Sequence, residues 1–93
     1  MKPKVYIITS EYVAHGMTFN RKLRYTTDPE KRDQIYEEEL QKMKIDNEDI
    51  LSDKENYMVQ KSNRKGSQIF FCYYKYQPEA SNFSVEVTSE TLE

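Results

Sequence analysis

The ten residues from Gln68 to Gln77, Gln-Ile-Phe-Phe-Cys-Tyr-Tyr-Lys-Tyr-Gln, form the longest apolar and aromatic run in the sequence. Successive side chains of a β-strand point to opposite faces of its sheet, so this run would be largely apolar on both sides. One side would carry Phe70, Cys72, Tyr74 and Tyr76, and the other Ile69, Phe71, Tyr73 and Lys75. Such a strand is typical of the centre of a sheet in which both faces need cover. We therefore expect a central strand here.

A hairpin is predicted at the start of the chain. Alternating residues indicate strands over residues 4–14 and 17–26, and Gly16 supplies the positive φ of a two-residue turn at His15-Gly16. If the two strands pair residue for residue from this turn onward, Ala14 pairs with Met17 and Tyr6 pairs with Tyr25. One face of the hairpin would then collect Tyr6, Ile8, Tyr12, Ala14, Met17, Phe19, Leu23 and Tyr25, and the other would collect Val5, Ile7, Thr9, Glu11, Val13, Thr18, Asn20, Lys22, Arg24 and Thr26. We expect this register to be firmly set, because a slip by one residue would mix apolar and polar side chains.

A helix follows the hairpin. Thr27 or Asp28 can serve as its N-cap, Thr27 and Glu30 fit a capping box, and Pro29 is tolerated in the first turn. Ile35, Tyr36, Leu40 and Met43 form its apolar stripe, and Glu37, Glu38, Glu39, Gln41 and Lys42 form its solvated side. The helix is expected to end near Lys44.

The second half of the chain predicts three more strands. Residues 45–55 are either a short turn of helix, with Ile50 and Leu51 against the core, or a loop. Residues 57–62 then form a hairpin with the aromatic run, which places Tyr57 and Val59 on the side of Phe70 and Cys72. After Pro78, Phe83, Val85 and Val87 alternate with Ser84, Glu86 and Thr88 in a final strand, and the chain is expected to fray from Ser89.

Length and pattern together predict one small α+β domain spanning residues 1–93. The simplest arrangement is a single antiparallel sheet of about five strands, in the order ββαβββ, with one main helix packed across one face. No signal peptide opens the sequence, and no stretch of about 18 apolar residues is present, so we expect a cytoplasmic protein that does not bind membranes.

The residue inventory argues against most catalytic and cofactor chemistry. The sequence has one histidine, His15, in the predicted turn, and two glycines far apart, which cannot form a phosphate-binding loop. No spacing suits a metal site, and Cys72 is interpreted as a buried hydrophobic residue rather than a nucleophile. We therefore expect no enzyme activity, no cofactor, no metal and no small-molecule substrate.

The charges are segregated along the chain, although the formal net charge is only −2. Residues 1–27 carry five basic and one acidic side chain, and residues 56–77 carry four basic and none acidic. Residues 28–55 carry five basic and eleven acidic side chains, and residues 78–93 carry four acidic ones. The predicted hairpins are thus basic while the helix and the C-terminal segment are acidic. Such a separation can orient the approach of a charged partner.

If the helix covers the side of the sheet that carries Cys72, the opposite side is left for function. It would present Ile69, Phe71, Tyr73, Lys75, Met58, Arg24 and Lys22. An exposed patch of aromatic and basic residues is typical of an interaction surface, so we expect a non-enzymatic protein–protein interaction domain. Its partner would be another protein or a second copy of this chain, as in a homodimer, bound through this face or an edge strand.

Two other interpretations of the same face stay open. Stacked aromatic residues flanked by Lys61, Arg64, Lys65 and Lys75 resemble a platform for single-stranded nucleic acid. The sequence pI of about 5.5 and the absence of an RRM signature make nucleic acid the less favoured partner. Alternatively, long side chains or the C-terminal segment cover the face and it binds nothing.

Overall fold

The computed structural model describes residues 3–92, which form a five-stranded antiparallel sheet and two α-helices. In chain order the elements are β1 (Lys4–Ala14), β2 (Met17–Thr26), α1 (Pro29–Asp46), α2 (Glu48–Ser52), β3 (Tyr57–Ser62), β4 (Ile69–Tyr74), the 3₁₀ helix η1 (Pro78–Ala80) and β5 (Ser81–Thr91). The predicted α+β class and the predicted order of strands and main helix are confirmed. The segment 45–55, which the sequence left open, contains the end of α1 and the short helix α2.

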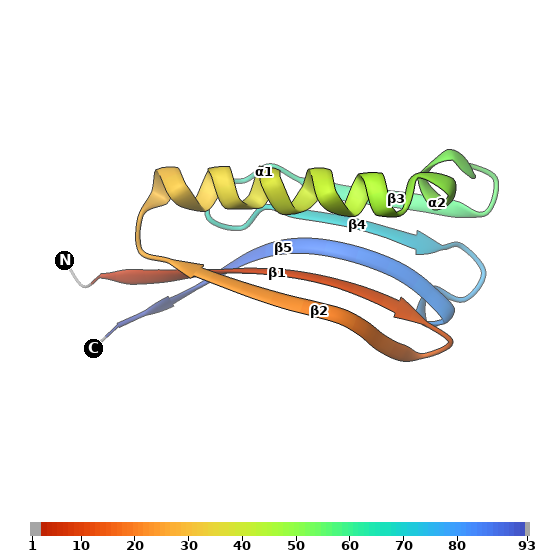
Figure 1. Cartoon of the computed structure of the whole chain (residues 1–93), viewed down its shortest axis with the longest axis horizontal. Helices are drawn as coiled ribbons and strands as arrows, with labels where there is room; N and C mark the ends of the chain where they lie inside the picture. Colours follow the sequence, from red (N-terminus) through yellow and green to blue (C-terminus); the bar gives the residue numbers. More distant parts are fainter. Residues whose placement is uncertain (1–2, 93) are drawn as a thin grey trace.

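Helix α1 runs along one face of the sheet, and no element of residues 3–92 covers the other face (Figure 1). The strands lie in the order β2-β1-β5-β4-β3, so the middle strand is β5. The aromatic run forms β4, which has a neighbouring strand on each side, as predicted for an interior strand. It is not the middle strand of the five, because β5 takes that position. An alternating strand such as β5 suits the middle of a sheet that has one covered and one uncovered face.

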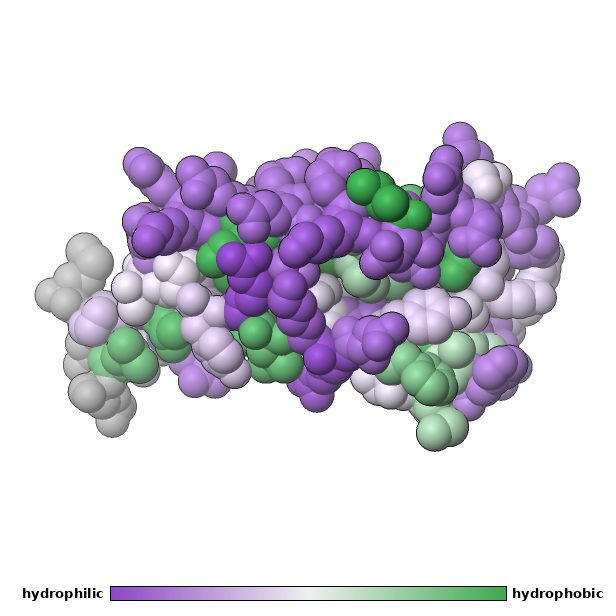
Figure 2. Space-filling model, in the orientation of Figure 1, coloured by the Kyte–Doolittle hydropathy of each residue, from purple (hydrophilic) through white to green (hydrophobic). Residues whose placement is uncertain are grey.

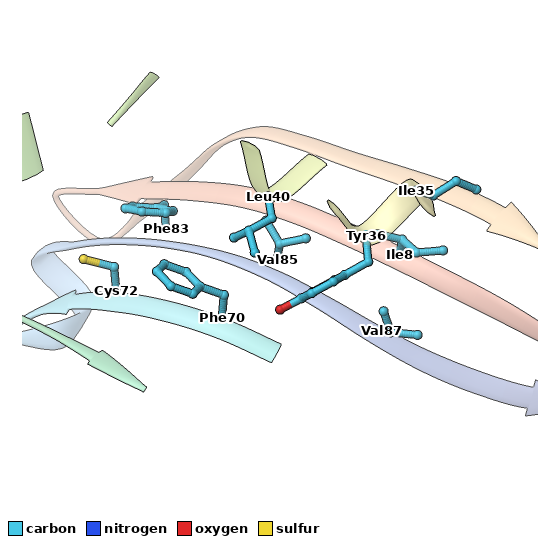
Figure 3. Close-up of a cluster of buried hydrophobic side chains, with 9 residues drawn as sticks. All are labelled: Ile8, Ile35, Tyr36, Leu40, Phe70, Cys72, Phe83, Val85 and Val87. Carbon is cyan, nitrogen blue, oxygen red and sulfur yellow. The ribbon is translucent and has the colours of Figure 1, made fainter. Parts of the chain in front are cut away.

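The hydrophobic core lies between α1 and the sheet. Tyr36 and Leu40 point from α1 onto the sheet, with Leu40 beside Val85 of β5, and Ile35 extends toward β2 (Figure 3). The outer surface of α1 is hydrophilic (Figure 2). Phe83 of β5 is fully buried, and its ring stacks on Phe70 of β4 with centroids 5.9 Å apart. The helical stripe and the inward side of β5 are therefore confirmed.

The β1–β2 hairpin begins in the predicted register. Ala14 pairs with Met17 and Tyr12 pairs with Phe19 across the turn at His15-Gly16. Both turn residues have positive φ, 54° for His15 and 75° for Gly16, as a two-residue turn of this kind requires.

A β-bulge in β2 then changes the register. Ser10 pairs with Lys22 and Ile8 with Arg24, so β2 has one more residue than β1 across the bulge. Asn20 lies in it with φ of 52°, a left-handed conformation that Asn adopts more readily than most residues. The uninterrupted register is therefore wrong beyond the bulge, and every later side chain of β2 lies on the face opposite to the predicted one.

Helix α1 starts as the sequence indicates and extends two residues further than predicted. Asp28 rather than Thr27 is the N-cap, and its Oδ1 accepts a 2.9 Å hydrogen bond from the Glu30 N–H. Two charged residues of the helix are unexpectedly buried, Arg32 at 7% exposure and Glu39 at 3%. The assignment of Glu39 to the solvated side is thus wrong, because the residue contacts cations of β2.

The two ends of the described chain lie side by side (Figure 1). β5 continues to Thr91, which pairs with Lys4, and the Leu92 N–H donates a 2.8 Å hydrogen bond to the Pro3 carbonyl. The prediction that the chain frays from Ser89 is therefore wrong for residues 89–92, because β1 supplies a backbone partner. Residue 93 lies outside the described range.

Candidate functional site

We call the side of the sheet away from α1 the open face. Its side chains include Ile7, Thr9 and Glu11 of β1, Leu23 and Tyr25 of β2, Met58 and Gln60 of β3, Ile69, Phe71 and Tyr73 of β4, and Ser84, Glu86, Thr88 and Glu90 of β5. The structure thus brings four predicted site residues, Ile69, Phe71, Tyr73 and Met58, onto one surface. Lys75 follows β4 in the same alternation, and its N–H donates a 2.8 Å hydrogen bond to the Asn56 carbonyl.

The β3–β4 half of the open face is aromatic and preorganised. The rings of Phe71 and Tyr73 stack with centroids 5.1 Å apart and an interplanar angle of 24°. The Tyr73 hydroxyl lies 3.4 Å from the Gln60 amide nitrogen and 3.8 Å from the Met58 sulfur. Phe71 and Tyr73 are half-buried, and Met58 is 46% exposed. These contacts hold the aromatic rings in place with one side facing solvent.

A second apolar group lies on the β1–β2 half of the same face. Tyr25 pairs with Ile7, and Leu23 pairs with Thr9. Tyr25 is 61% exposed and Leu23 is 40% exposed, which is unusual for large apolar side chains that share one face. The sequence placed Leu23 and Tyr25 on the helical side of the sheet, because the bulge that moves them to the open face was not predicted. The only signal was Asn20, a residue with low strand propensity, in the middle of an otherwise regular strand.

The centre of the open face carries a carboxylate. Glu86 lies between Thr9 of β1 and Ile69 of β4, and it is half-buried. Within residues 3–92, no Lys, Arg or His nitrogen approaches its carboxylate to within 4 Å, whereas the neighbouring Glu11 forms an ion pair of 3.7 Å with Arg21. The open face therefore has two apolar halves and an unpaired negative charge between them.

The two other predicted site residues, Lys22 and Arg24, do not lie on the open face. Past the bulge they point toward α1, where both bind the carboxylate of Glu39, at 3.0 Å from Lys22 and 3.1 Å from Arg24. Burial alone would raise the pKa of Glu39, but these hydrogen bonds outweigh it and lower the pKa. Their placement on the open face was wrong because it rested on the uninterrupted register.

A polar cluster at the start of α1 fixes the loop that leads into β4. The carboxylate of Asp33 accepts hydrogen bonds from Arg32 at 2.9 Å, Lys65 at 3.0 Å and Gln68 at 2.7 Å. The guanidinium of Arg32, with smaller effects of Lys65 and Gln68, holds the pKa of Asp33 well below its usual range. Since Gln68 directly precedes Ile69, this cluster positions the aromatic half of the open face.

Acidification is expected to destabilise the protein partly through Asp33. Its pKa is lower in the folded than in the unfolded chain, so its contribution to stability is present above about pH 4 and lost as the pH falls further. Asp33→Asn should therefore lower the free energy of unfolding at about pH 7, and the difference from wild type should narrow toward about pH 2. Urea unfolding across this range measures the difference, with Asp49→Asn, an exposed carboxylate of α2, as the control. A difference that does not change with pH would contradict this role.

The structure also contains a polar groove of about 700 Å³ on the helical side, between α1, α2 and the β1–β2 hairpin. Its charged residues are Lys22, Glu39, Lys42, Asp46 and Asp49. Both lysines approach Glu39, at 3.0 and 3.8 Å, so the buried carboxylate is already neutralised. In residues 3–92, no three or more His, Cys, Asp or Glu residues are grouped to hold a metal ion.

The single cysteine points from β4 to the helical side, away from the open face, and is unreactive. Cys72 is fully buried in the core, and burial raises the pKa of its thiol to about 11. The thiol is therefore protonated at neutral pH and inaccessible to a substrate.

Comparisons with known proteins add no assignment to this geometry. No protein-family model matches the chain, and no curated protein or solved structure matches it either. None of the helices in residues 3–92 has the length and apolar character needed to span a membrane.

Proposed function

We propose that this protein is a non-enzymatic interaction domain that binds another protein through the open face. The partner surface would place a Lys or Arg against Glu86 and apolar side chains against the two flanking groups. One observation carries this proposal: aliphatic and aromatic side chains lie on both sides of a central carboxylate, Glu86, that no cation of residues 3–92 approaches to within 4 Å. An ion pair between a partner's cation and a carboxylate flanked by apolar side chains contributes more to binding when the partner excludes water from it.

The size of the open face supports a protein partner. The molecule measures 46 × 21 × 19 Å, and the strands run along its longest dimension (Figure 1). A face of this length and width is comparable with the ~800 Å² per partner that a standard protein–protein interface buries. Aromatic and Met side chains such as Phe71, Tyr73 and Met58 are also enriched at such interfaces.

The charge of the open face distinguishes between the candidate partners. A face-to-face homodimer would bring the Glu86 carboxylates of the two copies close to each other, which is unfavourable without a counterion. Single-stranded nucleic acid requires a positive groove beside the aromatic rings. Of the four basic residues considered for nucleic acid, Lys61 points to the helical side and Lys65 binds Asp33, which leaves Arg64 and Lys75 to serve the open face. A protein surface with a basic centre fits better.

The non-enzymatic character and the cytoplasmic location belong to the same proposal. Cys72 is buried and protonated in the core and His15 is exposed in the hairpin turn, so these two residues do not form a nucleophile–base pair. A free, buried thiol is usual in a reducing compartment.

Site-specific photocrosslinking in cells tests the proposal. A photoreactive phenylalanine analogue at position 71 should yield a discrete protein adduct, and the same residue at Glu37, on the exposed side of α1, should not. Glu86→Lys should remove the adduct and weaken binding of the captured partner about 30-fold or more, which corresponds to about 2 kcal/mol. Circular dichroism should confirm that this variant is folded.

The matched control is Glu37→Lys, which makes the same charge change on α1 and should leave the adduct unchanged. The proposal is overturned if positions 71 and 37 give the same adducts, or if Glu86→Lys binds the partner as tightly as wild type does.

A further inference from the structure

The sheet has two edges, and they differ in how well they are protected against pairing with another strand. An edge strand presents unpaired backbone groups, which proteins usually blunt with bulges, charges or prolines. β2 has the bulge at Asn20 and three cations, Arg21, Lys22 and Arg24. β3 has neither bulge nor proline in its sequence Tyr-Met-Val-Gln-Lys-Ser, and its one charge is Lys61. β3 is therefore the open edge of the sheet.

Both sides of β3 are exposed as well. Helix α1 packs mainly over β5, β1 and β2 rather than over β3. Met58, on the open face, is 46% exposed, and its neighbour Val59, on the helical side, is 45% exposed. Two consecutive apolar residues at an unprotected edge favour the addition of a further strand.

The backbone hydrogen bonds show which groups of β3 face outward. The Lys75 N–H donates to the Asn56 carbonyl, which makes this pair a hydrogen-bonded one, and such pairs alternate along an antiparallel ladder. Tyr57, Val59 and Lys61 therefore direct their backbone groups away from β4. The Tyr57 N–H already donates a 3.1 Å hydrogen bond to the Asp53 carbonyl. The outward N–H groups of Val59 and Lys61 are therefore the ones that can donate to an added strand.

The charges at the two ends of β3 are opposite. Asp53, Lys54 and Glu55 precede the strand and carry a net charge of −1, whereas Lys61, Arg64 and Lys65 lie at its end and just beyond it. In an antiparallel pair of β3 strands, the acidic end of each copy lies beside the basic end of the other. This self-complementarity indicates that a second copy of the chain is the occupant of the edge.

We propose that two copies of the protein associate through antiparallel pairing of their β3 strands, about a two-fold axis at Val59. This arrangement places the two Val59 side chains together and Tyr57 beside the second copy's Lys61. A two-fold axis at Lys61 would instead oppose two like charges and is disfavoured. Both copies keep α1 on the same side, so the two sheets join into one continuous sheet. The edge is a separate surface from the centre of the open face, so this inference does not rest on the proposed function.

The expected dimer is weak, because one short strand buries less surface than a standard interface does. Sedimentation equilibrium of the full chain over about two orders of magnitude in concentration should show a rising dimer fraction. Val59→Cys should crosslink under mild oxidation, because residues at the two-fold axis face each other. Thr18→Cys, at an exposed position of β2, should stay monomeric under the same conditions. The native Cys72 is buried and should not contribute.

Two further variants separate pairing from folding. Val59→Pro removes an outward N–H without removing a bond to β4, so it should keep the fold and abolish the dimer. If it fails to fold, Lys61→Glu serves instead, because it should weaken the dimer roughly tenfold through repulsion from Asp53 and Glu55. A wild-type protein that stays monomeric at all concentrations, or equal crosslinking of Val59→Cys and Thr18→Cys, overturns the inference. An adduct at position 71 that persists in monomeric Val59→Pro would show that the open face acts independently of the dimer.

Discussion

Replacement of both Lys22 and Arg24 by alanine is expected to lower the free energy of unfolding by about 3 kcal/mol or more. Both side chains bind the carboxylate of Glu39, which is only 3% exposed. Their removal leaves Lys42, at 3.8 Å, as the one cation of residues 3–92 near this buried carboxylate. Breaking a buried charge pair by removing one side typically costs about 3–5 kcal/mol.

Glu39→Gln added to the same double variant is the matched control, because a neutral amide leaves no buried charge without a cation. It should recover a large part of the lost stability. Urea unfolding measures both variants. A Lys22→Ala/Arg24→Ala variant as stable as wild type would show that the ion pairs of Glu39 do not stabilise the packing of β2 against α1.

Replacement of Phe83 by alanine is expected to lower the free energy of unfolding by about 3–5 kcal/mol. Phe83 is 0% exposed in the middle strand and stacks on Phe70, so its removal leaves a cavity between α1 and the sheet. A domain of this size has a total stability of only about 5–15 kcal/mol, and the variant should therefore be close to unfolding. Thermal and urea denaturation measure the change.

Phe19→Ala provides the comparison, because it makes the same chemical change at a side chain that is 44% exposed. Its cost should stay below about 1 kcal/mol. Equal losses for the two variants would contradict the assignment of the core to the helical side of β5.

The fold was largely predictable because its elements have clear local signals. Strict alternation in residues 83–88 and the double-sided run of β4 predicted strands, and Asp28-Pro29 marked the start of α1. The central position of β5 could not be read from β4 alone. A strand flanked on both sides is compatible with either interior position, and the choice depends on the pairing of β1 with β5.

The candidate site was predicted in part, and the bulge accounts for the difference. Ile69, Phe71, Tyr73 and Met58 share a face because their two strands pair without interruption. In β2, one residue in a left-handed conformation reversed the faces of Lys22, Arg24, Leu23 and Tyr25. The burial of Glu39 was missed for a related reason. It lies next to Leu40 at the margin of the apolar stripe, and only its cationic partners on β2 make burial favourable.

The central claim is that a partner protein binds the open face, and methyl NMR of the labelled protein tests it most directly. The methyl groups of Ile7, Ile69 and Met58 report on the open face, and Ile45, which is 70% exposed on α1, reports on the opposite side. On titration with the partner captured at position 71, shifts and line broadening should be largest at Ile7, Ile69 and Met58, while Ile45 should stay unchanged. Perturbation of Ile45 with the three open-face methyl groups unchanged would contradict the account.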